Sequence, residues 1–323
     1  MKNSYLPEGS LLHTAENQEY ISSLAGLEKA YAEDKILEST VLFCDASLRL
    51  HIDLNGIIGI MDKEETLFCR FGETLKDIAI ITRVGKPIAF KVIGFRSEFG
   101  KTIAILSRKK AQEECHSKYL STLISGDIIP AKITHLENFG AFVDVGCGLS
   151  SLLTVDCISV SRISHPQDRV SIGEEIFVIV KSRDPLTDRL YVSMKELLGT
   201  WEENARAFEV GQTVLGIVRS IEDYGVFIEL TPNLAGLAEI RPDSRDTDIA
   251  RIGAPIAVYI KSILPDRMKI KLVLIDSYNG SVPREKHKYF IDCENVKHLN
   301  RWIYSPKSAT KLVETNFDEF CRQ

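Results

Sequence analysis

Long apolar runs are missing from this chain of 323 residues, although hydrophobic residues make up 44% of it. No stretch approaches the roughly 18–20 apolar residues that a membrane-spanning helix needs. Residues 1–20 contain no basic segment followed by an apolar one, which is the pattern of a secretory signal. The sequence therefore predicts neither a membrane segment nor a signal peptide, and we expect a cytoplasmic protein.

Metal-binding and catalytic patterns are also missing. The seven cysteines are odd in number, and no two are spaced as Cys-x-x-Cys. Cys115 has a histidine neighbour in His116, but two adjacent residues rarely form a metal site alone. The sequence offers no carboxylate cluster, histidine pair or glycine-rich phosphate loop. We therefore expect structural thiols, no metal ion, no cofactor and no enzymatic activity.

An excess of positive charge is the third absence, because the formal net charge is −5. A protein that binds duplex DNA neutralises many phosphates and usually has a strongly basic domain. The charge balance does not exclude single-stranded nucleic acid, because base stacking on aromatic side chains adds to phosphate neutralisation on one face. Any such binding must be confined to one face and depend in part on stacking.

The chain does contain an internal repeat. Residues 126–145 (GDIIPAKITHLENFGAFVDV) return 85 residues later as residues 211–230 (GQTVLGIVRSIEDYGVFIEL). Each block continues with a glycine turn and apolar run, an irregular polar stretch, a strand opening at glycine, and a last strand after a charged turn. Five short strands in roughly 70 residues predict a closed barrel, because closure removes exposed strand edges.

A weaker third copy lies upstream, in residues 36–60 and 84–108. It keeps the order of turns and strands but lacks the aromatic-Gly-x-Phe element, and residues 47–50 (SLRL) stand about where that element should be. We therefore expect this first repeat to lack an aromatic platform. In place of RNA binding, it is the predicted surface for docking a partner.

Segments between the repeats have helical spacing. Residues 16–33 place Tyr20, Leu24, Leu27 and Tyr31 on one face, and that helix packs either on the first barrel or on a partner. Residues 108–124 and 194–208 also have the pattern of short helices, and the tail is expected to add two strands that pack on the third barrel. The predicted fold is mainly β, with three tandem five-stranded barrels joined by short helical linkers. Its units are an N-terminal helical segment (1–34), a degenerate repeat (35–110), a helical linker (111–124), the middle repeat (125–197), a linker (198–208), the third repeat (209–276) and a C-terminal extension (277–323).

The motif Phe139-Gly140-Ala141-Phe142 is the main candidate for chemistry. Side chains alternate along a strand, so residues 139 and 142 should face opposite sides. A glycine often marks a bulge, and a bulge at Gly140 would bring both rings to the outer face. Unpaired bases stack on such rings with about 1–3 kcal/mol per base. The pattern alone leaves open that one or both rings fill the barrel.

These features resemble the ribosomal protein S1 family and its S1 RNA-binding domains, which have the oligonucleotide-binding (OB) barrel fold. The matching elements are Gly126-Asp127, Phe139-Gly140-Ala141-Phe142, the run Ser151-Leu152-Leu153-Thr154, Asp184, Arg189 and Val192-Ser193-Met194-Lys195. The resemblance covers most of residues 36–275. It implies that an RNA face contains Phe139, Phe142, Thr154, Asp184 and Arg189. Thr154 replaces the histidine of the family, so a hydroxyl stands where the family has a ring.

Further candidates complete this face. Lys195 ends the family signature, and Arg189 either contacts RNA or forms an ion pair with Asp184. Loop residues Arg162 and His165 could reach phosphates, unless the loop is solvated and Asp168 pairs with Arg169. In the third repeat the expected contacts are Tyr224, Phe227, Arg267 and Lys269, while Glu239 replaces the family histidine with a charge that opposes phosphate.

The function expected from the sequence is non-catalytic binding of single-stranded RNA, chiefly mRNA, in translation. The first repeat would dock on the small ribosomal subunit. The alternative is an RNA-linked regulator or protein-interaction scaffold that is not stably part of the ribosome. Residues 125–196 hold seven lysines and arginines against ten acidic residues. We therefore expect modest affinity per repeat and a shallow salt dependence.

Overall fold

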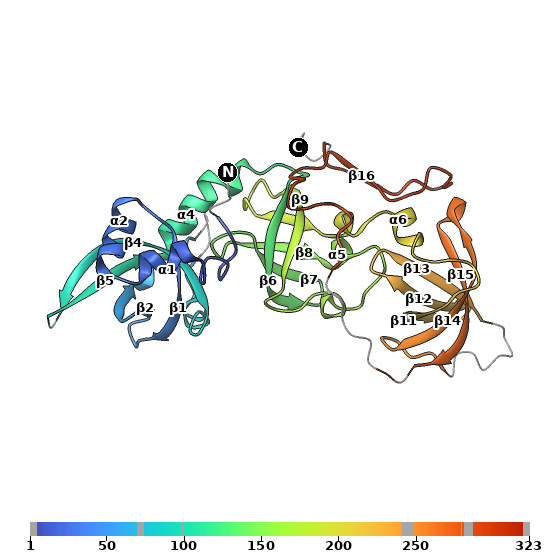
Figure 1. Cartoon of the computed structure of the whole chain (residues 1–323), viewed down its shortest axis with the longest axis horizontal. Helices are drawn as coiled ribbons and strands as arrows, with labels where there is room; N and C mark the ends of the chain where they lie inside the picture. Colours follow the sequence, from blue (N-terminus) through green and yellow to red (C-terminus); the bar gives the residue numbers. More distant parts are fainter. Residues whose placement is uncertain are drawn as a thin grey trace.

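Three closed five-stranded barrels follow one another along the molecule (Figure 1). The structure is a computed structural model that describes residues 5–69, 74–98, 100–240, 249–278, 280 and 287–318. In each barrel the strands neighbour one another in the order first, second, third, fifth and fourth, with the fourth closing on the first. The predicted fold, mainly β with three tandem OB-type barrels, is confirmed.

The strands of the three barrels have matching positions. The first barrel contains β1 (Leu37–Cys44), β2 (Leu50–Leu54), β3 (Ile57–Met61), β4 (Pro87–Glu98) and β5 (Lys101–Ser107), with the short helix α3 (Asp77–Ile81) between β3 and β4. The middle barrel contains β6 (Ile128–Glu137), β7 (Gly140–Asp144), β8 (Ser150–Thr154), β9 (Glu175–Arg183) and β10 (Leu190–Ser193), with α5 (Val155–Ile158) after β8. The third contains β11 (Thr213–Glu222), β12 (Gly225–Thr231), β13 (Leu234–Glu239), β14 (Pro255–Leu264) and β15 (Lys269–Ser277).

Alternation along the strands decides which side chains fill each barrel. In β7, Ala141 and Val143 are fully buried and Phe142 between them is only partly buried. The second strand of the third barrel repeats this arrangement, with Val226 and Ile228 inside the barrel. Each barrel therefore has an apolar interior and an outer face on which the intervening residues lie.

The N-terminal segment forms two helices where one was predicted. Helix α1 (Ala15–Ile21) ends at Ser22, and α2 (Leu24–Ala32) begins after Ser23. The Ser23 hydroxyl accepts a hydrogen bond from the backbone N–H of Gly26, which favours a new helix start over continuation of the first. The expected packing on the first barrel is confirmed, because Tyr20 and Leu27 are buried in its core cluster.

A buried carboxylate joins the first barrel to the middle one. Arg108, the first residue of α4 (Arg108–Lys118), donates hydrogen bonds of 2.6 and 3.0 Å to the two oxygens of Glu8. Glu8 also accepts from the backbone of Ala89 in β4, and its own N–H donates to Asp144 in β7 at 2.7 Å. Residues near Glu8 therefore lie between the two barrels and contact both.

The predicted helix over residues 194–208 is interrupted at Gly199. This glycine has a φ of +86°, a conformation that other residues rarely adopt. It separates a short 3₁₀ helix (Lys195–Leu198) from α6 (Trp201–Ala205). Helix α6 starts with a capping box, in which Thr200 and Glu203 each bond the backbone of the other.

The tail forms the two expected strands, β16 (Arg301–Ile303) and β17 (Glu314–Asn316), but its packing differs from the prediction. Its buried rings, Trp302 and Phe317, share a core cluster with Ile128 of the middle barrel as well as with the third barrel. The backbone N–H of Ile128 donates to Lys297 at 2.8 Å. The tail, red in Figure 1, therefore joins the middle and third barrels because its rings cover apolar residues of both.

Across the described ranges, no helix is long and apolar enough to cross a membrane. The same ranges contain no group of three or more histidine, cysteine or acidic side chains placed to hold a metal ion.

Candidate nucleic-acid interface

Both rings of the central motif lie on the outside of the middle barrel, for a different reason from the one expected. Strands β6 and β7 pair at Glu137 and Gly140, so Phe139 lies in the turn between them. A turn residue is outside the strand alternation, and its ring can therefore share a face with Phe142. The bulge expected at Gly140 is instead in β6, between Ile133 and His135.

Gly140 is required by close approach of the chain. A Cβ atom at this position would lie 2.4 Å from the Leu153 carbonyl oxygen and 2.9 Å from the Thr154 Cα atom. The backbone N–H of Val155 donates to the Phe139 carbonyl at 2.9 Å just beside this contact. The glycine therefore allows the β6–β7 turn to pack against the end of β8.

Three rings on the outside of the barrel form a cluster that we call the middle platform: His135, Phe139 and Phe142. Phe139 is 55% exposed, which excludes the alternative that it fills the barrel. Its ring meets that of Phe142 edge to face, with centroids 6.1 Å apart and planes at 88°. His135, which the sequence interpretation missed, lies opposite Phe142 in the register, with ring centroids 6.2 Å apart.

The third barrel repeats this geometry. Tyr224 is 61% exposed in the turn between β11 and β12, and its ring meets Phe227 with centroids 6.1 Å apart and planes at 90°. A Cβ atom at Gly225 would lie 2.6 Å from the Ala238 carbonyl oxygen of β13. Gly225 is therefore required by close approach of the next strand, in the same way as Gly140 in the middle barrel. Tyr224 and Phe227 form the third platform.

Across the neighbouring strands, each platform continues into one outer row. In the middle barrel, Phe142 pairs with Leu152 of β8, and Leu152 pairs with Tyr191 of β10. In the third barrel the row runs from Phe227 through Leu237 to Lys271. Tyr191 was missed by sequence interpretation, although it follows Arg189 at the period-2 spacing of one strand face.

Two of the predicted polar residues have structural partners. Asp184 accepts hydrogen bonds from the backbone of Leu186 and Thr187 and from the Thr187 hydroxyl. These bonds, with a smaller contribution from the charge of Arg189, hold the pKa of Asp184 below its usual value. Asp184 therefore shapes the turn before β10, and Arg189 is close enough to stabilise its charge.

Thr154 lies opposite Gly140 in the register, beside the turn that carries Phe139. Burial raises the pKa of the neighbouring Asp156. The hydrogen bond with the Thr154 hydroxyl and the charge of Lys181 together outweigh burial, so the pKa of Asp156 lies below its usual value. Lys195 donates to the Asp156 carbonyl at 3.2 Å. The predicted residues Thr154 and Lys195 are thus brought together, and Lys181 joins them from β9.

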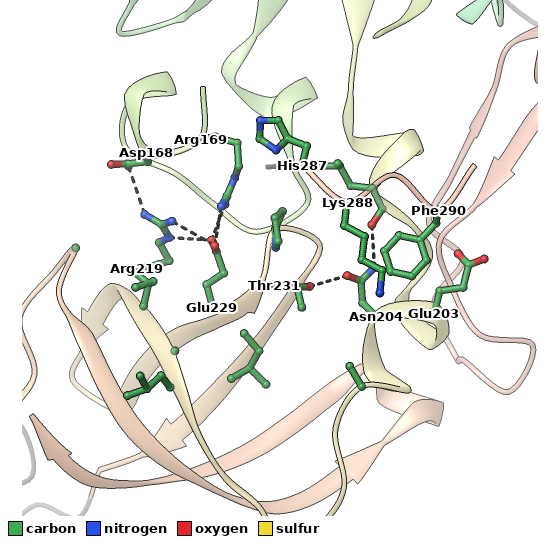
Figure 2. A pocket seen from close by; sticks show the side chains of 18 residues that line it. Asp168, Arg169, Glu203, Asn204, Arg219, Glu229, Thr231, His287, Lys288 and Phe290 are labelled. Carbon is green, nitrogen blue, oxygen red and sulfur yellow. Dashed lines mark hydrogen bonds and ion pairs between the residues drawn. The ribbon is translucent and has the colours of Figure 1, made fainter. Parts of the chain in front are cut away.

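The loop of residues 161–169 is held against the third barrel. Arg169 is buried and donates hydrogen bonds of 2.7 and 2.6 Å to Glu229 of β12, so the alternative that it pairs with Asp168 is wrong (Figure 2). Asp168 instead lies 3.5 Å from Arg219 of β11. His165 caps the following turn through its Nδ1 atom, while Arg162 is exposed.

In the third barrel, the acidic residue at the family histidine position has a cationic partner. Lys271 donates a 2.8 Å hydrogen bond to Glu239, and this bond and charge hold the pKa of Glu239 below its usual value. Lys269 is exposed at the start of β15, and Arg267 lies 3.5 Å from Asp266 in the preceding turn. The charge of Glu239 is therefore balanced next to the third platform.

Residues 122–195 match the family model described as the S1 RNA binding domain. The chain is 32% identical over 205 residues to the small ribosomal subunit protein bS1 of Staphylococcus aureus (strain COL), which covers 61% of this chain and 49% of that protein. It is 37% identical over 156 residues to the protein of the same name in Staphylococcus saprophyticus, covering 47% of this chain and 38% of that protein. The chain thus spans about half the length of the curated relatives it matches, or less.

Among solved structures, a multidomain protein with nucleic acid binding domains from Streptococcus pneumoniae covers 75% of this chain and 73% of its own. The sequence identity is 14% and the TM-score is 0.23, so this likeness is weak.

Proposed function

We propose that the chain is a non-catalytic binder of single-stranded RNA that acts in translation, and the match of residues 122–195 to the S1 RNA binding domain supports this. The observation that supports this best is the recurrence of one edge-to-face ring pair, with an exposed ring in the turn and a half-buried ring in the next strand, in two consecutive barrels. Unpaired bases stack on the middle and third platforms, because every base has an aromatic face and stacking requires no particular sequence.

Stacking supplies most of the affinity under this proposal, because charge contributes little. If two or three phosphates are neutralised, the slope of log K against log salt should be about −1.4 to −2.1 for a single strand. The predicted contacts of Arg162, Arg189, Lys195, Arg267 and Lys269 with phosphate remain part of the proposal. The proposed phosphate contacts of Arg189 and Lys195 are supported by their positions, because the two residues lie on either side of strand β10, next to the middle platform.

Two platforms on one chain raise the overall affinity through effective concentration. The tail and the Arg169–Glu229 pair link the middle barrel to the third, so one RNA strand meets both platforms on connected barrels. RNA long enough to reach both should therefore bind more tightly than RNA that reaches one.

The cellular partner in this proposal is the small ribosomal subunit, which is supported by the names of the curated relatives. A cytoplasmic location follows from the same proposal. Ile78 and Ile81 of α3 and the nearby Val84 are exposed apolar residues on the first barrel, and they suit docking to such a partner. The second candidate is an RNA-linked regulator outside the ribosome. Cosedimentation with small subunits distinguishes the two, since only the first function requires the protein in that fraction.

The decisive experiment replaces Phe139 and Phe142 together by alanine and measures binding to an unstructured oligoribonucleotide. If each ring supports one base, the affinity should fall by about 2–6 kcal/mol. The matched control is Tyr31→Ala, because Tyr31 is 51% exposed and also meets a ring, Phe95, edge to face. Unchanged affinity in a folded double variant would show that the platform does not bind RNA.

A further inference from the structure

The first barrel carries a stacked pair of rings, Phe43 exposed and His51 half-buried, that no sequence motif marks. Phe43 of β1 and His51 of β2 are stacked, with ring centroids 4.2 Å apart and planes at 12°. Phe43 is 50% exposed, close to the value for Phe139. The first repeat lacks the aromatic-Gly-x-Phe element, as expected, but it holds a ring pair of another kind.

The strand register places this pair at the position of the middle platform. The first strand of each barrel has a register shift at the equivalent position. The residue after the shift is paired with a residue of the second strand. In the first barrel that residue is Phe43, opposite His51. In the middle barrel it is His135, opposite Phe142. The two barrels therefore hold one phenylalanine and one histidine at equivalent positions, with the two residue types exchanged between strands.

The same register explains why the motif is absent. Leu48, with a φ of +62°, lies in the turn between β1 and β2, where the middle barrel has Phe139. The aromatic-Gly-x-Phe motif covers only this turn and the strand after it. The first barrel has no such motif because its phenylalanine lies in the strand before the turn.

The histidine ring is held in place by a charged neighbour. Asp45 accepts a 2.9 Å hydrogen bond from the Arg49 Nε atom and lies 3.1 Å from the His51 Nε2 atom. A backbone hydrogen bond from Arg49, followed by the His51 bond, holds the pKa of Asp45 well below its usual range. The carboxylate is therefore ionised, its charge is balanced by Arg49, and it fixes the orientation of the imidazole.

A hollow adjoins His51 on the outer face of the first barrel. Its volume is about 680 Å³, within the range of sites that hold small organic groups, and its lining includes Ile58, Ile60, Lys101 and Ile103. Ile58 is exposed, and Lys101 supplies a cation at the rim. Glu98 also lines the hollow, and its carboxylate is paired with Arg96 at 2.8 Å. An apolar wall next to a stacked ring pair suits the flat faces of bases, and the lysine suits the phosphate between them.

We propose that the first barrel carries a third site for single-stranded RNA, in which an unpaired base stacks on the Phe43–His51 pair. A neighbouring nucleotide lies in the hollow, with its phosphate near Lys101. This site deepens the proposed function and rests on it. RNA is favoured over a protein as the occupant because the ring pair repeats, position for position, the pair on the middle platform. The docking function of the first repeat then belongs to other residues, such as Ile78 and Ile81.

The test is photo-crosslinking of the whole protein to an oligoribonucleotide that contains 4-thiouridine, with residue-level mapping. We expect crosslinks in the segments that contain Phe43 and His51, in addition to those at the middle platform. Phe43→Ala should weaken the crosslinks of the first barrel by about 5- to 150-fold, which corresponds to the loss of one stacked base. Crosslinks at Phe142 should be retained, and Tyr31→Ala should leave both sets unchanged.

The outcomes separate this site from the proposed function. Crosslinks confined to the middle and third barrels would overturn the third site and leave the proposed function intact, whereas no crosslinks anywhere would overturn both. If Phe43→Ala leaves every crosslink unchanged but abolishes cosedimentation with small subunits, the face docks a protein and the inference is wrong. The map of the unaltered protein needs no variant, so the test holds even if Phe43→Ala fails to fold.

Discussion

Replacement of Glu229 by glutamine should destabilise the junction between the middle and third barrels. Arg169 of the middle barrel donates two hydrogen bonds to this carboxylate, and Arg219 of the third barrel donates bonds of 2.8 and 3.3 Å (Figure 2). Glu229 is 5% exposed. Burial raises its pKa, but the bonds and charges of Arg169 and then Arg219 outweigh this, so the pKa stays below its usual value.

The magnitude follows from what the substitution leaves behind. Glutamine keeps the shape but removes the charge, so the buried guanidinium of Arg169 loses its counter-ion and that of Arg219 keeps only Asp168, at 3.5 Å. Removal of one partner of a buried ion pair typically costs about 3–5 kcal/mol. The matched control is Glu239→Gln in the same barrel. Its pair with Lys271 is exposed to solvent, so this variant should unfold at nearly the same urea concentration as the unaltered protein.

Urea unfolding followed by tryptophan fluorescence measures this difference. The chain has two tryptophans, Trp201 and Trp302, and both are buried in the cluster that joins the two barrels. With a slope of about 1–3 kcal/mol per molar urea, Glu229→Gln should lower the midpoint by about 1 M or more. If the two glutamine variants unfold at the same urea concentration, the buried pair does not stabilise the junction and the reasoning fails.

Two further predictions concern Glu38 and Gly140. Burial, as the largest cause, raises the pKa of Glu38 to about 7 from an ordinary 4.5, so the folded protein favours the neutral form. The contribution of Glu38 to stability should therefore be greatest below about pH 4.5, and it should fall as the pH rises towards 7. Thermal unfolding at pH 5 and pH 8 checks this, and Glu38→Gln should reduce the difference between them. Gly140→Ala places a methyl group against the Leu153 carbonyl and should cost about 1–3 kcal/mol and displace Phe139. Gly94→Ala, where nothing lies within 4 Å, is its control; equal unfolding midpoints for the two alanine variants would refute the close-approach argument.

The sequence by itself determined the local features. Strand alternation and glycine turns predicted three barrels, because period-2 burial and turn conformation depend on neighbouring residues. The offset between residues 126–145 and 211–230 predicted two equivalent motifs, and both form the same edge-to-face ring pair. The prediction of a single N-terminal helix was wrong. The spacing of Tyr20 and Leu27 indicated one continuous helix, whereas Ser23 is a capping residue at which a second helix begins.

Only the tertiary structure decided which distant residues meet. The loop of residues 161–169 looks like a phosphate-binding segment, yet Arg169 finds its counter-ion in Glu229, 60 residues away. The rings of the tail bury themselves between two barrels, because apolar area from both is available there. Phe43 and His51 stack on each other because the register after the shift in β1 pairs Phe43 with His51 of β2. Pairing across strands and between barrels is set by register and docking, and neither is encoded in the residues next to a motif.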